Sequence, residues 1–176
     1  MQNKDMLKIK YLFESCLFVV IVMVASCTPA TKPASTPVEK KENPETIVAN
    51  IAPAYEEQIL NAVNNYRKKK GLPVLQSNFV ISAEARKHSM NMATRRTPFG
   101  HNGISARTKI ITGKVNGVSF VAENVAHGSM SAQEVVNGWI QSSGHRKNME
   151  GNYTLTGIGV ARNQKSELYF TQIFAR

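Results

Sequence analysis

Apolar residues at helical spacing predict two helices in the first half of the folded part. The first carries Ile59, Val63 and Tyr66 on one stripe and ends at the Gly-Leu-Pro sequence of residues 71–73. The second is expected over residues 78–94, and its buried stripe consists of Ile81, Ala85, His88 and Met92. Because His88 lies on this stripe, we interpret it as a packed or rim histidine and not as a ligand.

The segment 95–120 has no clear periodicity. Pro98 and Gly100 favour a loop over residues 95–103. Residues 107–111 fit a short helix or a strand equally well, and the glycines that follow them indicate turns.

The last third of the chain combines one amphipathic helix with two strands. Ser131 and Glu134 form a capping-box sequence at the start of the helix, and Gly144 is expected to end it. Its buried face consists of Val135, Val136, Trp139 and Ile140. Residues 157–160 and 168–174 are strand-like runs on either side of a polar turn, a pattern typical of a hairpin. Helices first and strands last predict an α+β fold.

The N-terminal segment predicts export and lipid attachment. Residues 1–26 are a basic stretch followed by an apolar run too short for a permanent membrane span, as in a bacterial signal peptide. The run ends in Val24-Ala-Ser-Cys27, which resembles a lipobox, so we expect lipid on Cys27; the alternative is an ordinary signal with a chance cysteine. Residues 27–53 are proline-rich without apolar periodicity and are expected to be a tether to the membrane, and residues 54–176 to be one folded domain.

Cysteine content and charge narrow the classes of protein further. The two cysteines are Cys16, within the signal, and Cys27, so the folded domain is expected to have no disulfide. The net charge is +10 and falls by one when residues 1–26 are removed. A positively charged surface suits binding to anionic lipids or to anionic polymers of the cell envelope. Nucleic acid is not expected as a partner, because the densest basic run, residues 67–70, lacks interleaved aromatic residues and is better placed to close a helix.

Several short motifs occur in an order that resembles the CAP superfamily (cysteine-rich secretory proteins, antigen 5 and pathogenesis-related 1 proteins). They are Asn64-x-x-Arg67 with Gly71-Leu72, Phe99-x-His101, Glu123-Asn-Val-Ala126, Trp139-x-x-Ser142-x-Gly-His145-Arg-x-Asn-Met149, Gly157-Ile-Gly-Val160 and Phe170-Thr-Gln-x-Phe174. The resemblance covers essentially all of residues 54–176. It implies a three-layer α-β-α sandwich with a central, mostly antiparallel sheet and a cleft on one side.

The resemblance also implies a set of cleft residues. Members with the full pattern have two histidines and two glutamates there, and His101 and Glu123 match the first of each by position. The chain departs at the other two places, which are Ser142 and Tyr169, while His145 follows a pattern of the bacterial branch and could supply the second imidazole.

The chemistry of this cleft leaves three alternatives open. His101, Glu123 and His145 could bind a divalent, zinc-like cation; they could instead lock loops in place, or serve an envelope hydrolase that uses a metal-activated water. A Ser142 or Ser143 nucleophile lacks the nucleophile-elbow sequence. We expect a monomeric, extracytoplasmic CAP-domain protein, lipid-anchored to a bacterial membrane (the outer membrane if the cell is Gram-negative), with a cleft that binds an envelope ligand or a cation.

Overall fold

The computed structural model describes residues 44–176, with side chains from residue 52 onward. The predicted signal peptide, the lipidation site Cys27 and most of the predicted tether lie outside this range. The helices are α1 (Pro44–Lys69), α2 (Phe79–Ala93), α3 (Ile104–Lys114), α4 (Ala132–Gln141) and α5 (Ser143–Met149), and the strands are β1 (Gln76–Ser77), β2 (Val121–Gly128), β3 (Leu155–Arg162) and β4 (Leu168–Ala175).

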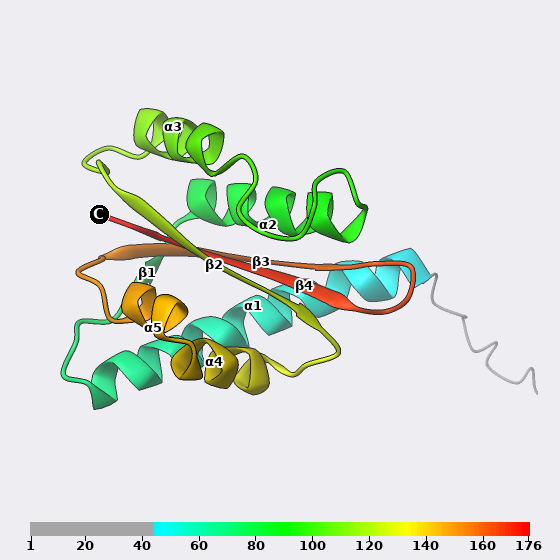
Figure 1. The fold of residues 1–176 in the computed structure, drawn as a ribbon, viewed down its shortest axis with the longest axis horizontal. Coiled ribbons are helices and arrows are strands. Elements are labelled where there is room, and N and C mark those ends of the chain that lie inside the picture. The colour runs from blue at the N-terminus through cyan, green and yellow to red at the C-terminus, as the bar shows by residue number, and fades with distance from the viewer. Residues whose placement is uncertain (1–43) are drawn as a thin grey trace, which may run out of the picture. The chain divides into compact units, whose positions relative to one another are not determined.

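The four strands form one mixed sheet in the order β1-β3-β4-β2. The two-residue β1 pairs parallel to β3, whereas β4 is antiparallel to both β3 and β2. Helices α2 and α3 cover one face of the sheet, and α1, α4 and α5 cover the other (Figure 1). The α-β-α sandwich expected from the motifs is therefore confirmed, with a sheet that is mostly but not purely antiparallel.

Two apolar clusters, one on each face, hold the layers together. The larger one packs α1 and α4 against β3 and β4, around Trp139, which is 1% exposed as its position in the helix predicted. The smaller one packs α2 and α3 against the sheet around Ile81 and Ile173. Because successive strand residues face opposite layers, β4 contributes Phe174 to the first cluster and Ile173 to the second.

Helix α2 lies directly on the backbone of β3. A Cβ atom on Gly157 would come within 2.2 Å of the Ser82 amide nitrogen, and one on Gly159 within 2.2 Å of the Arg86 amide nitrogen. The Gly-Ile-Gly-Val sequence thus combines two functions, because its glycines admit the helix and Ile158 and Val160 fill the opposite core.

Two predicted boundaries differ from the structure. Helix α1 begins at Pro44 and includes Pro53, both of which we had assigned to the tether. A proline inside a helix removes one N–H donor, and its ring also crowds the carbonyl four residues earlier. Packing offsets part of this cost, since Ala52, just before Pro53, already contacts the larger cluster. At the other end, Gly144 does not end a helix: Ser142, with ψ near 120°, separates α4 from α5, and Gly144 lies within α5.

The open choices in the middle of the chain are decided in favour of helix. Residues 107–111 belong to α3. The capping box of α4 is confirmed, since the Ser131 amide donates to Glu134 Oε2 at 2.8 Å and the Glu134 amide donates to Ser131 Oγ at 3.3 Å. The strand pair β3–β4 confirms the predicted hairpin.

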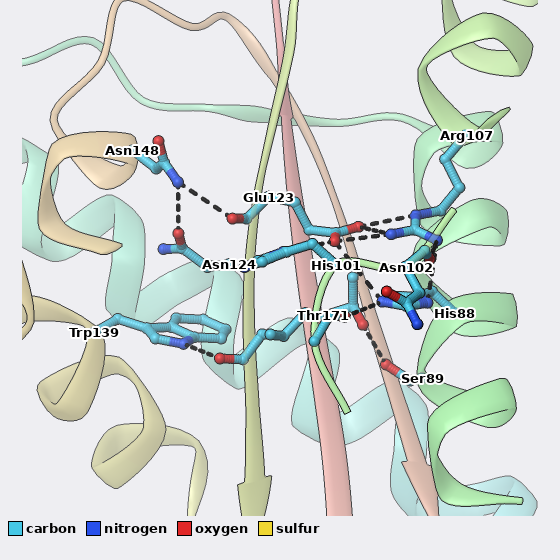
Figure 2. Close-up of polar contacts among 12 residues, drawn as sticks. His88, Ser89, His101, Asn102, Arg107, Glu123, Asn124, Trp139, Asn148 and Thr171 are labelled. Carbon is cyan, nitrogen blue, oxygen red and sulfur yellow. Dashed lines mark hydrogen bonds and ion pairs between the residues drawn. The ribbon is translucent and has the colours of Figure 1, made fainter. Parts of the chain in front are cut away.

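Strand β2 is an edge strand, and side chains from α4 and α5 cover its open side. The indole N–H of Trp139 donates to the Val125 carbonyl at 3.3 Å, and the Asn148 amide donates to the Glu123 carbonyl at 3.2 Å (Figure 2). Asn124, which is fully buried, donates to the His145 carbonyl at 3.1 Å. The strand is thereby fixed along both of its sides, by β4 on one and by these side chains on the other.

Candidate functional site

Glu123 is the centre of a buried polar cluster on the face of β2 that α2 and α3 cover. Its residue is 6% exposed. The guanidinium of Arg107, from α3, grips the carboxylate with two donors, Nε to Oε2 at 2.9 Å and Nη2 to Oε1 at 2.8 Å (Figure 2). A bidentate arginine–carboxylate pair of this kind is strong and fixes the orientation of both groups.

The other donors of Arg107 bind the neighbouring loop and α2. Nη1 donates to the Asn102 carbonyl at 2.8 Å and to His88 Nδ1 at 3.1 Å. Gly103, which precedes α3 with φ near +80°, makes room for this contact, because a Cβ there would lie 3.3 Å from Nη1. Arg107 therefore ties α2, α3 and the loop before α3 to the edge strand.

His88 is a packed histidine, as its place on the apolar stripe predicted, and it is 1% exposed. Since arginine has no acceptor, His88 Nδ1 accepts from Arg107, and Nε2 carries the proton that it donates to the Gly100 carbonyl at 2.8 Å. Burial, and then the positive charge of Arg107, lower the pKa of His88 below its usual value of 6.5. The imidazole is accordingly neutral at neutral pH.

His101 is the member of the cluster that reaches solvent. Its Nδ1 lies 2.9 Å from Glu123 Oε1, and its side chain is 50% exposed while that of Glu123 is 1% exposed. With Nδ1–H donating to the carboxylate, Nε2 keeps its lone pair and faces outward. The structure thus joins His101 and Glu123, two residues that the family resemblance assigned to one cleft, by a direct contact.

The other predicted cleft residues, all within the described part of the chain, make no hydrogen bond to this pair. His145 is in the first turn of α5, half-buried, and burial followed by the charge of His101 lowers its pKa. Ser142 lies at the junction of α4 and α5. Within residues 52–176, neither side chain hydrogen-bonds to His101 or Glu123, so no serine–histidine–carboxylate arrangement is formed there.

Tyr169 belongs to a separate stack of rings near the loop of His101. It faces His127 across the β2–β4 pair, with ring centroids 5.5 Å apart and an interplanar angle of 19°. Phe99 packs edge-on against His127 at 4.5 Å. His127, to which the sequence suggested no role, is therefore the middle ring of an aromatic row.

The carboxylate of the predicted metal trio already has hydrogen-bond partners. Both oxygens of Glu123 already accept charge-assisted hydrogen bonds, and the Arg107 guanidinium would repel a cation placed beside them. No group of three histidine, cysteine, aspartate or glutamate side chains suited to a metal ion occurs in the described part of the chain. A metal site formed by His101, Glu123 and His145 therefore stays a prediction, and in the structure the guanidinium of Arg107 binds the carboxylate.

Residues 60–174 match the CAP family, described as the cysteine-rich secretory protein family. The chain belongs to this family.

Two bacterial proteins resemble the chain in sequence. It is 33% identical over 138 residues to the uncharacterized protein YkwD of Bacillus subtilis, an alignment that spans 77% of this chain and 51% of that protein. It is 32% identical over 125 residues to the uncharacterized membrane protein YlbC of the same organism, spanning 69% of this chain and 34% of YlbC. The chain thus spans about half and about a third of the length of these two relatives.

Solved structures support the same CAP fold. An extracellular protein of Bacillus anthracis with an SCP domain superposes with a TM-score of 0.61 at 26% identity, covering 81% of this chain and 45% of that one. An outer surface protein of Borrelia burgdorferi superposes with a TM-score of 0.59 at 18% identity, covering 70% of this chain and 92% of that one.

The sequence did not predict that Arg107 and Asn102 belong to the polar cluster around Glu123. Arg107 lies in the segment whose secondary structure was undecided, so its direction could not be inferred. Gly103 was the available signal, since a glycine directly before a helix indicates a backbone or side chain that must pass close by.

The helices of residues 44–176 include none that is long and apolar enough to cross a membrane.

Proposed function

We propose that this chain is a lipid-anchored, extracytoplasmic CAP-domain protein that binds an envelope ligand at His101. The observation that carries the proposal is the pair of His101 and Glu123. A buried carboxylate fixes the ring through Nδ1, and a half-exposed ring offers Nε2 to the outside. Such a group accepts a hydrogen bond from a ligand when it is neutral and donates one when it is protonated.

Export and anchoring are supported by the N-terminal sequence and by the relatives. The signal-like residues 1–26 end in Val24-Ala-Ser-Cys27, and among the relatives are proteins described as extracellular and as an outer surface protein. The diacylglyceryl group would sit on Cys27. The tether then extends from Cys27 to the start of α1 at Pro44.

The contacts favour binding over metal-assisted hydrolysis. Hydrolysis by a metal-activated water requires ligands that are free to bind the ion. Glu123 lacks this freedom, and no serine hydroxyl in residues 52–176 hydrogen-bonds to His101.

Anchoring and binding are tested separately. Mass spectrometry of the mature protein should find a diacylglyceryl-modified Cys27, and Cys27→Ala should leave the membrane fraction; an unmodified Cys27 in a freely soluble protein would refute the anchor.

For the cleft, native protein and His101→Ala are compared for retention on washed envelope fragments of the source cell, with His127→Ala as the control for an exposed imidazole. Loss of retention with His101→Ala alone supports the proposal, and equal retention of all three proteins refutes it.

A further inference from the structure

Four acceptor atoms converge on the guanidinium of Arg107. Two are the carboxylate oxygens of Glu123, at 2.9 Å from Nε and 2.8 Å from Nη2. The third is Nδ1 of His88, at 3.1 Å, and the fourth is the carbonyl oxygen of Asn102, at 2.8 Å. They come from β2, α2 and the loop before α3, and Figure 2 shows all three segments around the arginine.

These acceptors require a positive charge between them. Glu123 is 6% exposed and His88 is 1% exposed, and an ionised carboxylate buried without a partner costs several kcal/mol. The lone pair on Nδ1 of His88 also points toward the guanidinium, because the proton is on Nε2, at the other side of the ring, and is donated to the Gly100 carbonyl. The pocket is thus organised around a cation that the chain itself supplies.

We propose that Glu123, His88 and the Asn102 carbonyl form a cation site whose resident cation is the guanidinium of Arg107. When the arginine side chain is shortened, a free guanidinium ion or a divalent metal ion takes its place. Two carboxylate oxygens, a carbonyl oxygen and one imidazole nitrogen are donors that zinc-like ions accept. The site includes neither His145 nor the exposed Nε2 of His101, so it differs from the trio that the sequence suggested.

The structure also provides a route by which an ion could enter. A cavity of about 210 Å³ lies against the cluster, and His88, Asn102, Gly103 and Arg107 are part of its lining. Removal of the arginine side chain would connect this cavity with the carboxylate. In the native protein the guanidinium closes that connection, so we expect no zinc uptake at the cluster.

The test measures thermal unfolding of the full chain, kept soluble in a non-ionic detergent, with zinc chloride or with guanidinium chloride at millimolar concentration. Guanidinium denatures proteins only at far higher concentrations. Arg107→Ala should unfold at a lower temperature than the native protein, and each cation should raise its midpoint by roughly 5 °C or more at saturation. The native midpoint should not rise.

Three matched variants identify the site. Arg107→Lys supplies a tethered cation and should not respond to either ion, and Arg107→Ala combined with Glu123→Gln removes the charge that attracts them and should not respond either. Arg107→Ala combined with His101→Ala should keep its response to zinc, because His101 is outside the proposed ligand set. If Arg107→Ala does not fold, Arg107→Gln takes its place in each comparison.

The proposal is overturned if the folded Arg107 variant responds to neither cation. It is also overturned if the Glu123→Gln combination responds as strongly, or if native protein gains the same stability from zinc. The proposed ligand binding at His101 is unaffected by these outcomes, because envelope retention is measured on the protein with Arg107 intact.

Discussion

The guanidinium of Arg67 donates a hydrogen bond to the carbonyl oxygen of Met149 at 2.7 Å, joining the last turn of α1 to the end of α5. The same side chain is 1% exposed. It also donates to three other carbonyls, those of Pro73, Gly151 and Tyr153. The first residue of the most basic run in the chain is therefore an internal cross-link, whereas the three lysines that follow it are exposed.

Arg67→Met should lower the free energy of unfolding by about 3 kcal/mol or more, because it leaves several buried carbonyls without donors. Urea unfolding measures the effect. Lys68→Met is the matched control, since Lys68 is exposed in the same helical turn and should change little. A loss no larger than that of the control would show that water replaces the guanidinium at no cost.

Trp139→Ala should cost about 3–5 kcal/mol, the range for removing a large buried aromatic side chain. The substitution also frees the Val125 carbonyl that the indole now binds at 3.3 Å. Gln133→Ala, an exposed position on the same helix, is the control and should leave the unfolding midpoint nearly unchanged. A loss below about 1 kcal/mol for Trp139→Ala would contradict the packing described above.

Glycine-to-alanine substitutions should have opposite signs at two kinds of position. Gly157→Ala should destabilise strongly, because its Cβ would lie 2.2 Å from a backbone nitrogen of α2 that cannot yield without moving the helix. Gly138→Ala, in α4, meets nothing within 4 Å and should stabilise by about 0.5–1 kcal/mol through its better helix propensity. Differential scanning calorimetry of the two variants and native protein gives both signs, and equal shifts in the same direction would contradict the close approach of α2 to β3.

The stability of the domain should fall as the pH drops below about 6.5. The pKa of His88 is lowered in the folded state, by burial first and by Arg107 second, so the unfolded chain binds more protons in this range. By linkage, the contribution of His88 is complete above its unfolded pKa and is lost as the pH falls toward the lower folded pKa. His145 contributes with the same sign, because its pKa is also lowered.

Urea unfolding between pH values of about 7.5 and 5.5, on either side of the ordinary histidine pKa, tests this dependence. His88→Gln should flatten the slope but not abolish it, since His145 remains. His127→Gln is the control, as an exposed imidazole outside the cluster. An unchanged slope in His88→Gln would show that the proton uptake has another source.

The sequence was informative where local pattern and packing agree. The stripe of α2, the capping box of α4 and the β3–β4 hairpin each depend on residues close in the chain, and all three were predicted correctly. Strand β1 was not predicted, because it has two residues and no periodicity of its own, and it exists because β3 lies beside it.

The site was predicted in part for a similar reason. The family resemblance assigned His101 and Glu123 to one cleft, but the hydrogen bonds of Glu123 depend on Arg107, sixteen positions earlier in a segment whose secondary structure the sequence left open. Residue types alone suggested a metal site, because two histidines and a glutamate are compatible with zinc. The deciding fact, a guanidinium already bound to the carboxylate, becomes visible only when α3 is placed over β2.

The side chains that cover the outer edge of β2 have a consequence for the protein outside the cell. An open edge strand presents a row of unpaired carbonyls and amides to which a second chain can add, and such addition leads to aggregation. Trp139 and Asn148 occupy the outward carbonyls of Val125 and Glu123, and α4 and α5 stand where a further strand would have to lie. Copies of the chain that meet at high local concentration can therefore do so without pairing edge to edge along β2.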